Sequence, residues 1–379
     1  MPMARRSAES KLMFALISLG VLSGAIGAEL ISRGFEERVE AVGATVLEGA
    51  AEAFRAQQAA EQEKLASTLD GLMACPRLLA AFLRRDRDGL QQLAAPTLAV
   101  LRERDRITHW YFHEAGGEGR VFLRVHKPEL FGDAVDRTTL RRAIETGELG
   151  AGLELGKTAF ALRVVRPWTA DGRIIGYMEL AVEVDHFLTA MRGRSGDDYG
   201  LLVQKRLIDE KAWAAVLGPR VKSWNTRADL LVVDATDVVG GLGAFDGDIE
   251  GLPERGRFLG EVERAGRTTI HGVFPLPDAA GRKVAALYVA HDFTAHHQAV
   301  REGRRQAWAV MLVLSVVAAL LMVGLAHRLV FRRLTLLRQR LERRAAGTEQ
   351  AGAPGTDHLH DDLERIEALF DRALGGPER

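Results

Sequence analysis

The sequence predicts an α+β protein with a long N-terminal helix and two tandem antiparallel-sheet modules, flanked by two transmembrane helices. Three observations predict this architecture. Apolar segments lie near both ends of the chain, at residues 12–32 and 307–326. Apolar residues recur at helical spacing after the first segment. Short runs of aromatic and β-branched residues, separated by turn residues, then follow in two successive sets.

The composition excludes several classes of protein. The 379 residues include 51 basic and 51 acidic side chains, so the chain lacks the positive charge of a nucleic-acid-binding protein. One cysteine, Cys75, allows neither an internal disulfide nor two-cysteine redox chemistry. The phosphate-binding G-x-x-x-x-G-K-[ST] and hydrolase G-x-S-x-G patterns are missing. We therefore expect no enzyme, no catalytic residue and no cofactor.

The two apolar segments are each long enough, or nearly so, to cross a bilayer as a helix, which takes about 20 residues. Basic residues near a span tend to remain in the cytoplasm, which places residues 1–11 and 327–379 inside. Residues 33–306 are then periplasmic or extracellular, in a multi-pass protein of the inner (plasma) membrane. The basic residues concerned are Arg5, Arg6 and Lys11 before the first span and Arg328, Arg332, Arg333, Arg338 and Arg340 after the second.

A cleaved signal peptide is the alternative for the first segment, because Ala25 and Gly27 form a small-x-small cleavage pattern. Residues 33–306 are exported in either case. Only the number of membrane anchors differs between the two interpretations.

Residues 33–105 are predicted to form a long extracytoplasmic helix, with a bend at Cys75-Pro76. Its apolar stripe can pack on the following domain or on a second copy of the helix, and we expect a homodimer. The stripe consists of Phe35, Val39, Val42, Val46, Leu65, Leu69 and Leu72.

Residues 106–195 are predicted to form the first sheet module. Asp171-Gly172 indicates a hairpin turn between its last two strands, and a helix is expected over 137–145. Five strands with one helical excursion form a small α+β module. The strands are expected at 107–113, 120–126, 150–156, 158–166 and 173–183.

Residues 196–295 repeat this order and are predicted to form a second module of the same architecture. Trp213 and Trp224 flank a helical stretch within it. A connecting helix at 296–306 then leads to the second span. The strands are expected at 199–204, 230–233, 257–264, 268–275 and 283–290.

The first module resembles the membrane-distal half of a double Cache sensor, a PAS-like extracytoplasmic domain of bacterial receptors. The resemblance is carried by WYFH at 110–113, FLRVHKPELFGD at 122–133 with Arg137, GLELG at 152–156, LRVVRP at 162–167 and IGYMEL at 175–180. It implies a receptor for a small molecule that serves a chemotaxis transducer, a histidine kinase or a cyclic-dinucleotide enzyme. The best-known amino-acid-binding signature of related sensors is not evident.

Side chains alternate along a strand, which predicts where a ligand could bind. Arg124 and His126 share one face with Phe122, while Arg163 and Glu179 fall on the apolar faces of their own strands. If these faces coincide, a small anionic or zwitterionic ligand would suit them. With an aromatic wall and Glu154 of the third strand, the candidate ligand-binding residues are Trp110, Tyr111, Arg124, His126, Glu154, Arg163 and Glu179.

Other interpretations of these residues remain open. Arg163 and Glu179 could pair with each other or face water, and Asp133 and Arg137 are expected to cap and brace the excursion helix. Histidines at 109, 113 and 126, and at 291, 296 and 297, have no spacing diagnostic of a metal site, so no metal is expected.

The tail at 327–379 resembles a HAMP relay that lacks the usual proline. A basic helix over 329–346, a connector at 347–355 and a second helix from Asp361 would form a short coiled coil. An amphipathic tail without a relay role is the alternative. Because no output module follows, a cytoplasmic signalling partner is expected to act in trans.

The leading hypothesis is thus a transmembrane receptor in which the first module binds a small ligand and a conformational signal passes through the second span to the HAMP-like tail. A non-catalytic scaffold or partner subunit, whose exported domain docks another protein, is the rival. A membrane-bound enzyme would need activity without any recognisable motif.

Overall fold

The computed structural model describes residues 3–156, 159–209, 227–236 and 245–326, with isolated positions between 328 and 343. The chain divides into two units. One is Leu30–Arg305, and the other combines Met1–Glu29 with Gln306–Arg379. The predicted stretch around Trp213 and Trp224 and almost all of the HAMP-like tail lie outside the described residues.

Three helices precede the first strand: α1 (Met3–Met73), α2 (Pro76–Leu83) and α3 (Arg87–Asp105). The expected bend at Cys75-Pro76 is present and measures 72°. The prediction of one helix over 33–105 is wrong after this bend, because the chain breaks again at Arg85, whose φ of 56° is left-handed. Asp86 starts α3 by accepting the Gly89 N–H at 2.9 Å.

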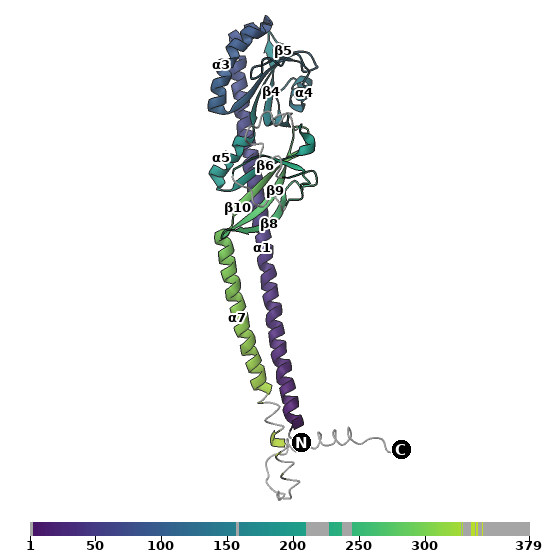
Figure 1. The fold of residues 1–379 in the computed structure, drawn as a ribbon, viewed down its shortest axis with the longest axis vertical. Helices are drawn as coiled ribbons and strands as arrows, with labels where there is room; N and C mark the ends of the chain where they lie inside the picture. The colour runs from purple at the N-terminus through teal and green to yellow at the C-terminus, as the bar shows by residue number, and fades with distance from the viewer. Residues whose placement is uncertain are drawn as a thin grey trace, which may run out of the picture. The chain divides into compact units, whose positions relative to one another are not determined.

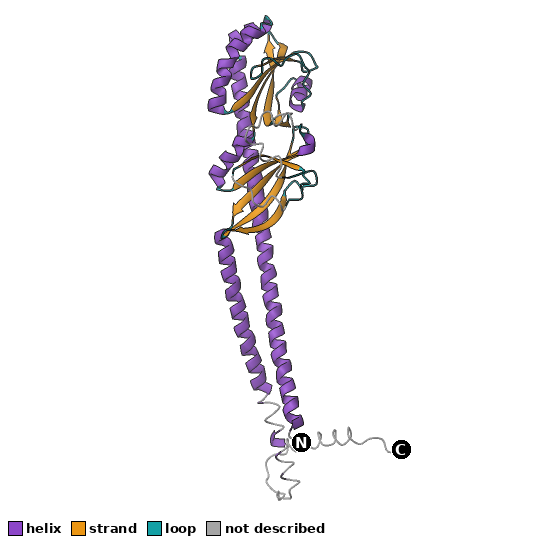
Figure 2. Cartoon of the chain, viewed as in Figure 1, coloured by secondary structure: helices purple, strands orange, loops and turns teal. Residues whose placement is uncertain are grey.

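The two sheet modules share one topology, as predicted. Each has five antiparallel strands, in the orders β2-β1-β5-β4-β3 and β7-β6-β10-β9-β8 (Figures 1 and 2). The first sheet consists of β1 (Ile107–Glu114), β2 (Val121–Arg124), β3 (Gly150–Leu155), β4 (Phe160–Ala170) and β5 (Arg173–Glu183). The second consists of β6 (Asp198–Gln204), β7 (Leu230–Ala235), β8 (Arg257–Arg264), β9 (Arg267–Pro277) and β10 (Lys283–Asp292).

Short helices connect and cover the strands. α4 (Thr138–Thr146) is the predicted excursion helix between β2 and β3. α5 (Asp185–Ser195) joins the two sheets, and a 3₁₀ turn (Lys205–Leu207) follows β6.

One face of each sheet packs with α1–α3 in a single apolar core. The core draws Phe54 and Leu65 from α1, Phe112 from the first sheet and Leu287 from the second, all fully or almost fully buried. Burial of this kind contributes about 25 cal/mol for each Å² of apolar surface removed from water. Four residues of the predicted helical stripe pack on the modules of this chain: Leu65 and Leu69 lie in the core, and Val46 and Leu72 pack against it.

Close packing at Gly176 of β5 leads to a first prediction. A Cβ at this position would lie 2.5 Å from the His113 carbonyl oxygen and 2.7 Å from Cζ of Phe82. We expect Gly176→Ala to lower the free energy of unfolding by about 1–3 kcal/mol, the usual cost of overpacking. Urea unfolding of the variant measures the change. Gly116→Ala is the matched control because its Cβ would meet nothing within 4 Å, and equal stability of the two variants would contradict the prediction.

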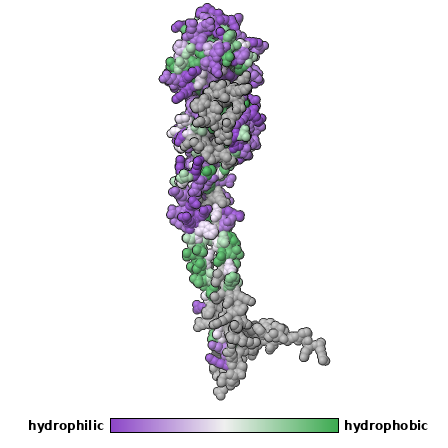
Figure 3. Space-filling model, viewed as in Figure 1, coloured by the Kyte–Doolittle hydropathy of each residue, from purple (hydrophilic) through white to green (hydrophobic). Residues whose placement is uncertain are grey.

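The second unit contains the apolar parts of α1 and of α7 (Thr294–Ala326). Thr294–Leu325 is long and apolar enough to cross a membrane, whereas α1 meets that criterion only when it is joined to α2 across the bend. Figure 3 shows hydrophobic surface gathered on these helices. Its exposed residues include Leu19, Leu22, Ile26, Leu312, Val313 and Leu320.

Small residues line the contact between the two helices of this unit. A Cβ added to Gly20 would lie 3.4 Å from Ala319, and one added to Gly24 would lie 2.6 Å from Ser315 Oγ. Gly27 approaches Met311 in the same way. Glycines at such positions let helix backbones come close together, which is how helices associate in lipid.

Candidate ligand site in the first module

The candidate site lies on the face of the first sheet that is turned away from the core of α1–α3. Strand pairing sets Tyr111 opposite Glu179, and Glu179 in turn opposite Val165. Arg163 lies two residues before Val165 on β4 and so points to the same face. The predicted coincidence of the Arg163 and Glu179 faces is therefore present in the structure.

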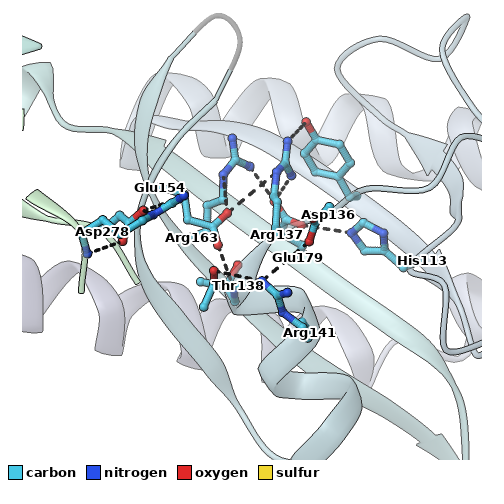
Figure 4. Close-up of polar contacts among 12 residues, drawn as sticks. His113, Asp136, Arg137, Thr138, Arg141, Glu154, Arg163, Glu179 and Asp278 are labelled. Atoms are coloured by element: carbon cyan, nitrogen blue, oxygen red, sulfur yellow. Dashed lines mark hydrogen bonds and ion pairs between the residues drawn. The ribbon is translucent and has the colours of Figure 1, made fainter. Parts of the chain in front are cut away.

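Glu179 is the centre of a buried ionic cluster, drawn in Figure 4. Its carboxylate is fully buried and accepts hydrogen bonds from Arg163 Nη1 at 2.6 Å, Arg137 Nη1 at 2.8 Å and His113 Nε2 at 3.0 Å. Burial opposes ionisation, but the two guanidinium groups outweigh it and hold the pKa of Glu179 well below its usual value. Glu179 is thus a carboxylate at neutral pH.

Glu154 forms the second acidic part of the ionic cluster. Its Oε1 accepts the Thr139 backbone N–H at 2.8 Å, at the start of α4. Its Oε2 lies 3.7 Å from Arg163 Nε and 3.9 Å from Arg137 Nε, too far for a hydrogen bond to either. Burial raises the pKa of Glu154. The side chain therefore keeps one oxygen available on the cluster.

Four buried polar atoms of the ionic cluster have no hydrogen-bond partner among the described residues. They are Glu154 Oε2, Arg163 Nε, His113 Nδ1 and Thr139 Oγ1. Buried polar atoms are rarely left unpaired, since each costs about 1–3 kcal/mol. Both donors and acceptors of hydrogen bonds thus remain open in the same small volume.

Arg137 connects the ionic cluster to the surface. It precedes α4 at the N-cap position, where its side chain makes no capping bond. Instead it reaches Glu179, and its Nη2 donates to Tyr111 Oη at 3.3 Å. Its side chain is 17% exposed, against 2% for Arg163. The prediction that Arg137 caps the helix through its side chain is therefore wrong, because the guanidinium pairs with Glu179 in the ionic cluster instead.

Two of the predicted site residues lie beside the ionic cluster. Arg124 forms a two-pronged ion pair with Asp133, at 2.7 Å for each contact, and its guanidinium lies 5.6 Å from the Tyr111 ring. The His126 ring meets those of Tyr111 and His109 edge-on, with ring centres 4.8 and 4.6 Å apart. Arg124 thus braces the loop that follows β2, and His126 borders the aromatic side of the site.

Two predictions about side-chain direction are wrong. Trp110 lies in the core on the opposite face, next to Phe112, because neighbouring residues of a strand point to opposite sides. Phe122 does not share a face with Arg124. A register shift between Phe112 and His113 makes Phe122 an extra residue, and its ring packs on Phe82 at 5.3 Å.

His113 was not among the predicted site residues, and for Arg137 capping and bracing of the helix were favoured over ligand contact. His113 lies two residues from Tyr111 on the same strand, so alternation along the strand could have identified it. Among the described residues, no group of three or more His, Cys, Asp or Glu side chains is arranged to hold a metal ion.

The fold and the site together define a tandem sensory module, and the comparison with protein families agrees. Residues 45–297 match the family described as the double sensory domain of two-component sensor kinases. The match covers more than half of the chain, and the chain belongs to this double Cache family. A search of curated proteins finds no match.

Solved sensor domains show a distant likeness. The periplasmic domain of Vibrio cholerae LuxQ is 11% identical over 66% of this chain and 99% of its own, with a TM-score of 0.35. The sensor domain of the V. cholerae histidine kinase DctB is 11% identical over 67% and 98%, with a TM-score of 0.39. The ligand-binding domain of the Campylobacter jejuni chemoreceptor Tlp3, solved with L-valine, is 12% identical over 69% and 95%, with a TM-score of 0.34.

Proposed function

We propose that this chain is a transmembrane sensory receptor whose first module binds a small extracytoplasmic ligand at the ionic cluster. The ligand carries a carboxylate, alone or together with a positively charged group. Binding passes a conformational signal through the second module and α7 to the cytoplasmic tail, and a partner protein carries the output. The receptor acts as a homodimer, and no step of this function needs catalysis.

The observation that carries the proposal is the contrast between the two modules. The corresponding face of the second sheet has no ionic cluster among the described residues. Leu202, Val273 and Ala286 pack there with Phe245 and Ile249. Its buried polar pair is His271 with the Tyr288 hydroxyl, and burial lowers the pKa of His271. The same topology therefore forms without a buried ionic cluster at this place. Replacing a buried ion pair with apolar residues is often neutral or stabilising, so a buried ionic cluster is poor evidence of a stabilising role. Ligand recognition accounts for its presence in the first module.

The geometry suggests how a ligand would bind. Arg137 is the more exposed arginine, so a ligand carboxylate would compete with Glu179 for it. A donor on the ligand would occupy Glu154 Oε2, which accepts no hydrogen bond from the described residues. Such a ligand shifts the receptor between two states only by the difference in its affinity for them.

Ligand capture by the full-length protein tests this proposal. Protein purified from its host membranes is extracted, and the small molecules released are identified by mass spectrometry. We expect Arg137→Met to reduce the captured amount by roughly tenfold or more, because a charge-assisted pair contributes about 1.5–3 kcal/mol. Arg141→Met is the matched control, since Arg141 lies on the exposed side of the same helix.

Equal capture by both variants would show that the ionic cluster is not the binding site. A soluble protein that co-purifies with the wild type, without any small molecule, would instead support the docking-subunit alternative.

A further inference from the structure

The turn between β9 and β10 of the second sheet contacts the first module beside the ionic cluster. The Ala279 N–H donates to the Leu153 carbonyl oxygen of β3 at 2.7 Å. The Ala279 carbonyl oxygen accepts from Arg142 Nη2 of α4 at 3.1 Å. The turn therefore bonds to β3, which carries Glu154, and to α4, whose first turn Glu154 holds.

The contact requires close approach of two backbones. Gly152 of β3 has a φ of +153°, and a Cβ there would lie only 2.8 Å from Cβ of Ala279. Arg142 also donates to the Ala151 carbonyl oxygen at 3.4 Å. A side chain at position 152 would push the turn away from β3.

The turn itself is stiffened from within. Asp278 is buried, and its Oδ1 accepts the N–H groups of Ala280 and Arg282, both at 2.9 Å. Its Oδ2 accepts the Arg282 guanidinium at 2.8 and 2.6 Å. A displacement of the turn would therefore move it as one piece.

One end of this contact leads to the ionic cluster, and the other leads to the start of α7. On one side, Leu153 precedes Glu154, whose carboxylate holds Thr139 at the start of α4. On the other side, β10 begins at Lys283, directly after the turn, and lies between β6 and β9 in the sheet. It ends at Asp292, and α7 begins at Thr294.

We propose that the turn 278–282 is the mechanical link through which the ionic cluster controls the second module and the start of α7. The inference rests on the proposed function in so far as the cluster is the element that responds to a ligand. A change at Glu154 moves β3 or α4, the turn follows through Ala279, and β10 carries the displacement toward α7. Packed elements convert small shifts into discrete rearrangements in this way.

Hydrogen–deuterium exchange of the full-length chain in lipid nanodiscs tests the link without any ligand. Glu154→Gln perturbs the ionic cluster, and Arg142→Met removes the contact of α4 with the turn. We expect either change to speed exchange at the turn and in β10 by roughly tenfold, within the range of typical coupling between sites. Adding Glu154→Gln to Arg142→Met should have little further effect on β10.

Arg141→Met is again the matched control and should leave the turn at the wild-type rate. If Glu154→Gln does not fold, Arg137→Met serves as the perturbation of the cluster. Faster exchange at Thr139 with unchanged exchange at the turn and in β10 would overturn the link. The ligand-capture experiment has an independent readout, so failure of the link and failure of the proposed function are distinguishable.

Discussion

Replacing Arg163 with Met is expected to destabilise the first module by about 3–5 kcal/mol, the usual cost of removing one partner of a buried ion pair. The Arg163 side chain is 2% exposed and donates to Glu179, which is fully buried. The variant leaves the Glu179 charge with Arg137 and His113 alone, in a place that water does not reach. Hydrogen exchange of the β4 and β5 amides under native conditions measures the loss as a free energy of opening.

A double-mutant cycle separates this effect from simple loss of packing. Glu179→Gln removes the negative charge that Arg163 neutralises. The double variant should therefore lose less free energy of unfolding than the sum of the two single variants, by about 0.5–3 kcal/mol. Additive costs would show that the two side chains do not depend on each other. That result would also remove the basis for treating the ionic cluster as one unit.

Acid is expected to destabilise the first module through His109 and His126. Burial lowers the pKa of His126 to about 3 and, with the charge of Arg163, lowers the pKa of His109 well below its usual value. Both are neutral in the folded protein, while an unfolded chain binds protons near pH 6.5. Above pH 6.5 these histidines are neutral in both states, and their contribution to the free energy of unfolding is complete. As the pH falls toward the folded pKa, only the unfolded chain binds protons, and this contribution is lost. Each histidine should cost about 2 kcal/mol between pH 7.5 and 5.

The matched measurement compares the wild type with the His109→Gln/His126→Gln variant at each pH. His186 acts in the opposite direction. Hydrogen bonds and charges from Asp185 and Glu61 overcome its burial and raise its pKa to about 9, so its contribution is complete below pH 6.5 and lost as the pH rises through 9. The difference between wild type and variant removes that effect. Parallel stability curves from pH 7.5 to 5 would contradict the prediction.

Alternation along regular strands explains how much of the site could be predicted. Glu179 and Arg163 lie on neighbouring antiparallel strands whose pairing is regular between them, so counting residues placed both on one face. The same counting failed in β2, where the register shift near Phe112 adds one residue. No residue type in that segment marks the shift.

Contacts made by the helices were harder to predict. Arg137 reaches Glu179 only because α4 lies over that face of the sheet. Apolar spacing along the chain predicts the helix but not where it packs on the sheet. The second break in the N-terminal helical region has no Gly or Pro at Arg84–Asp86, although Asp86 is a recognisable helix-capping residue. The double-sheet architecture was predictable because strand order and turn residues occur twice.

The start of α4 is stabilised by a side chain from another element. Arg137 occupies the capping position but turns its guanidinium away, and Glu154 of β3 accepts the Thr139 N–H in its place. A helix of nine residues cannot sustain itself by local hydrogen bonds alone. We therefore expect any molecule that draws the Glu154 carboxylate toward itself to fray the first turn of α4. If the site binds a ligand as proposed, occupancy is expected to melt this end of the helix.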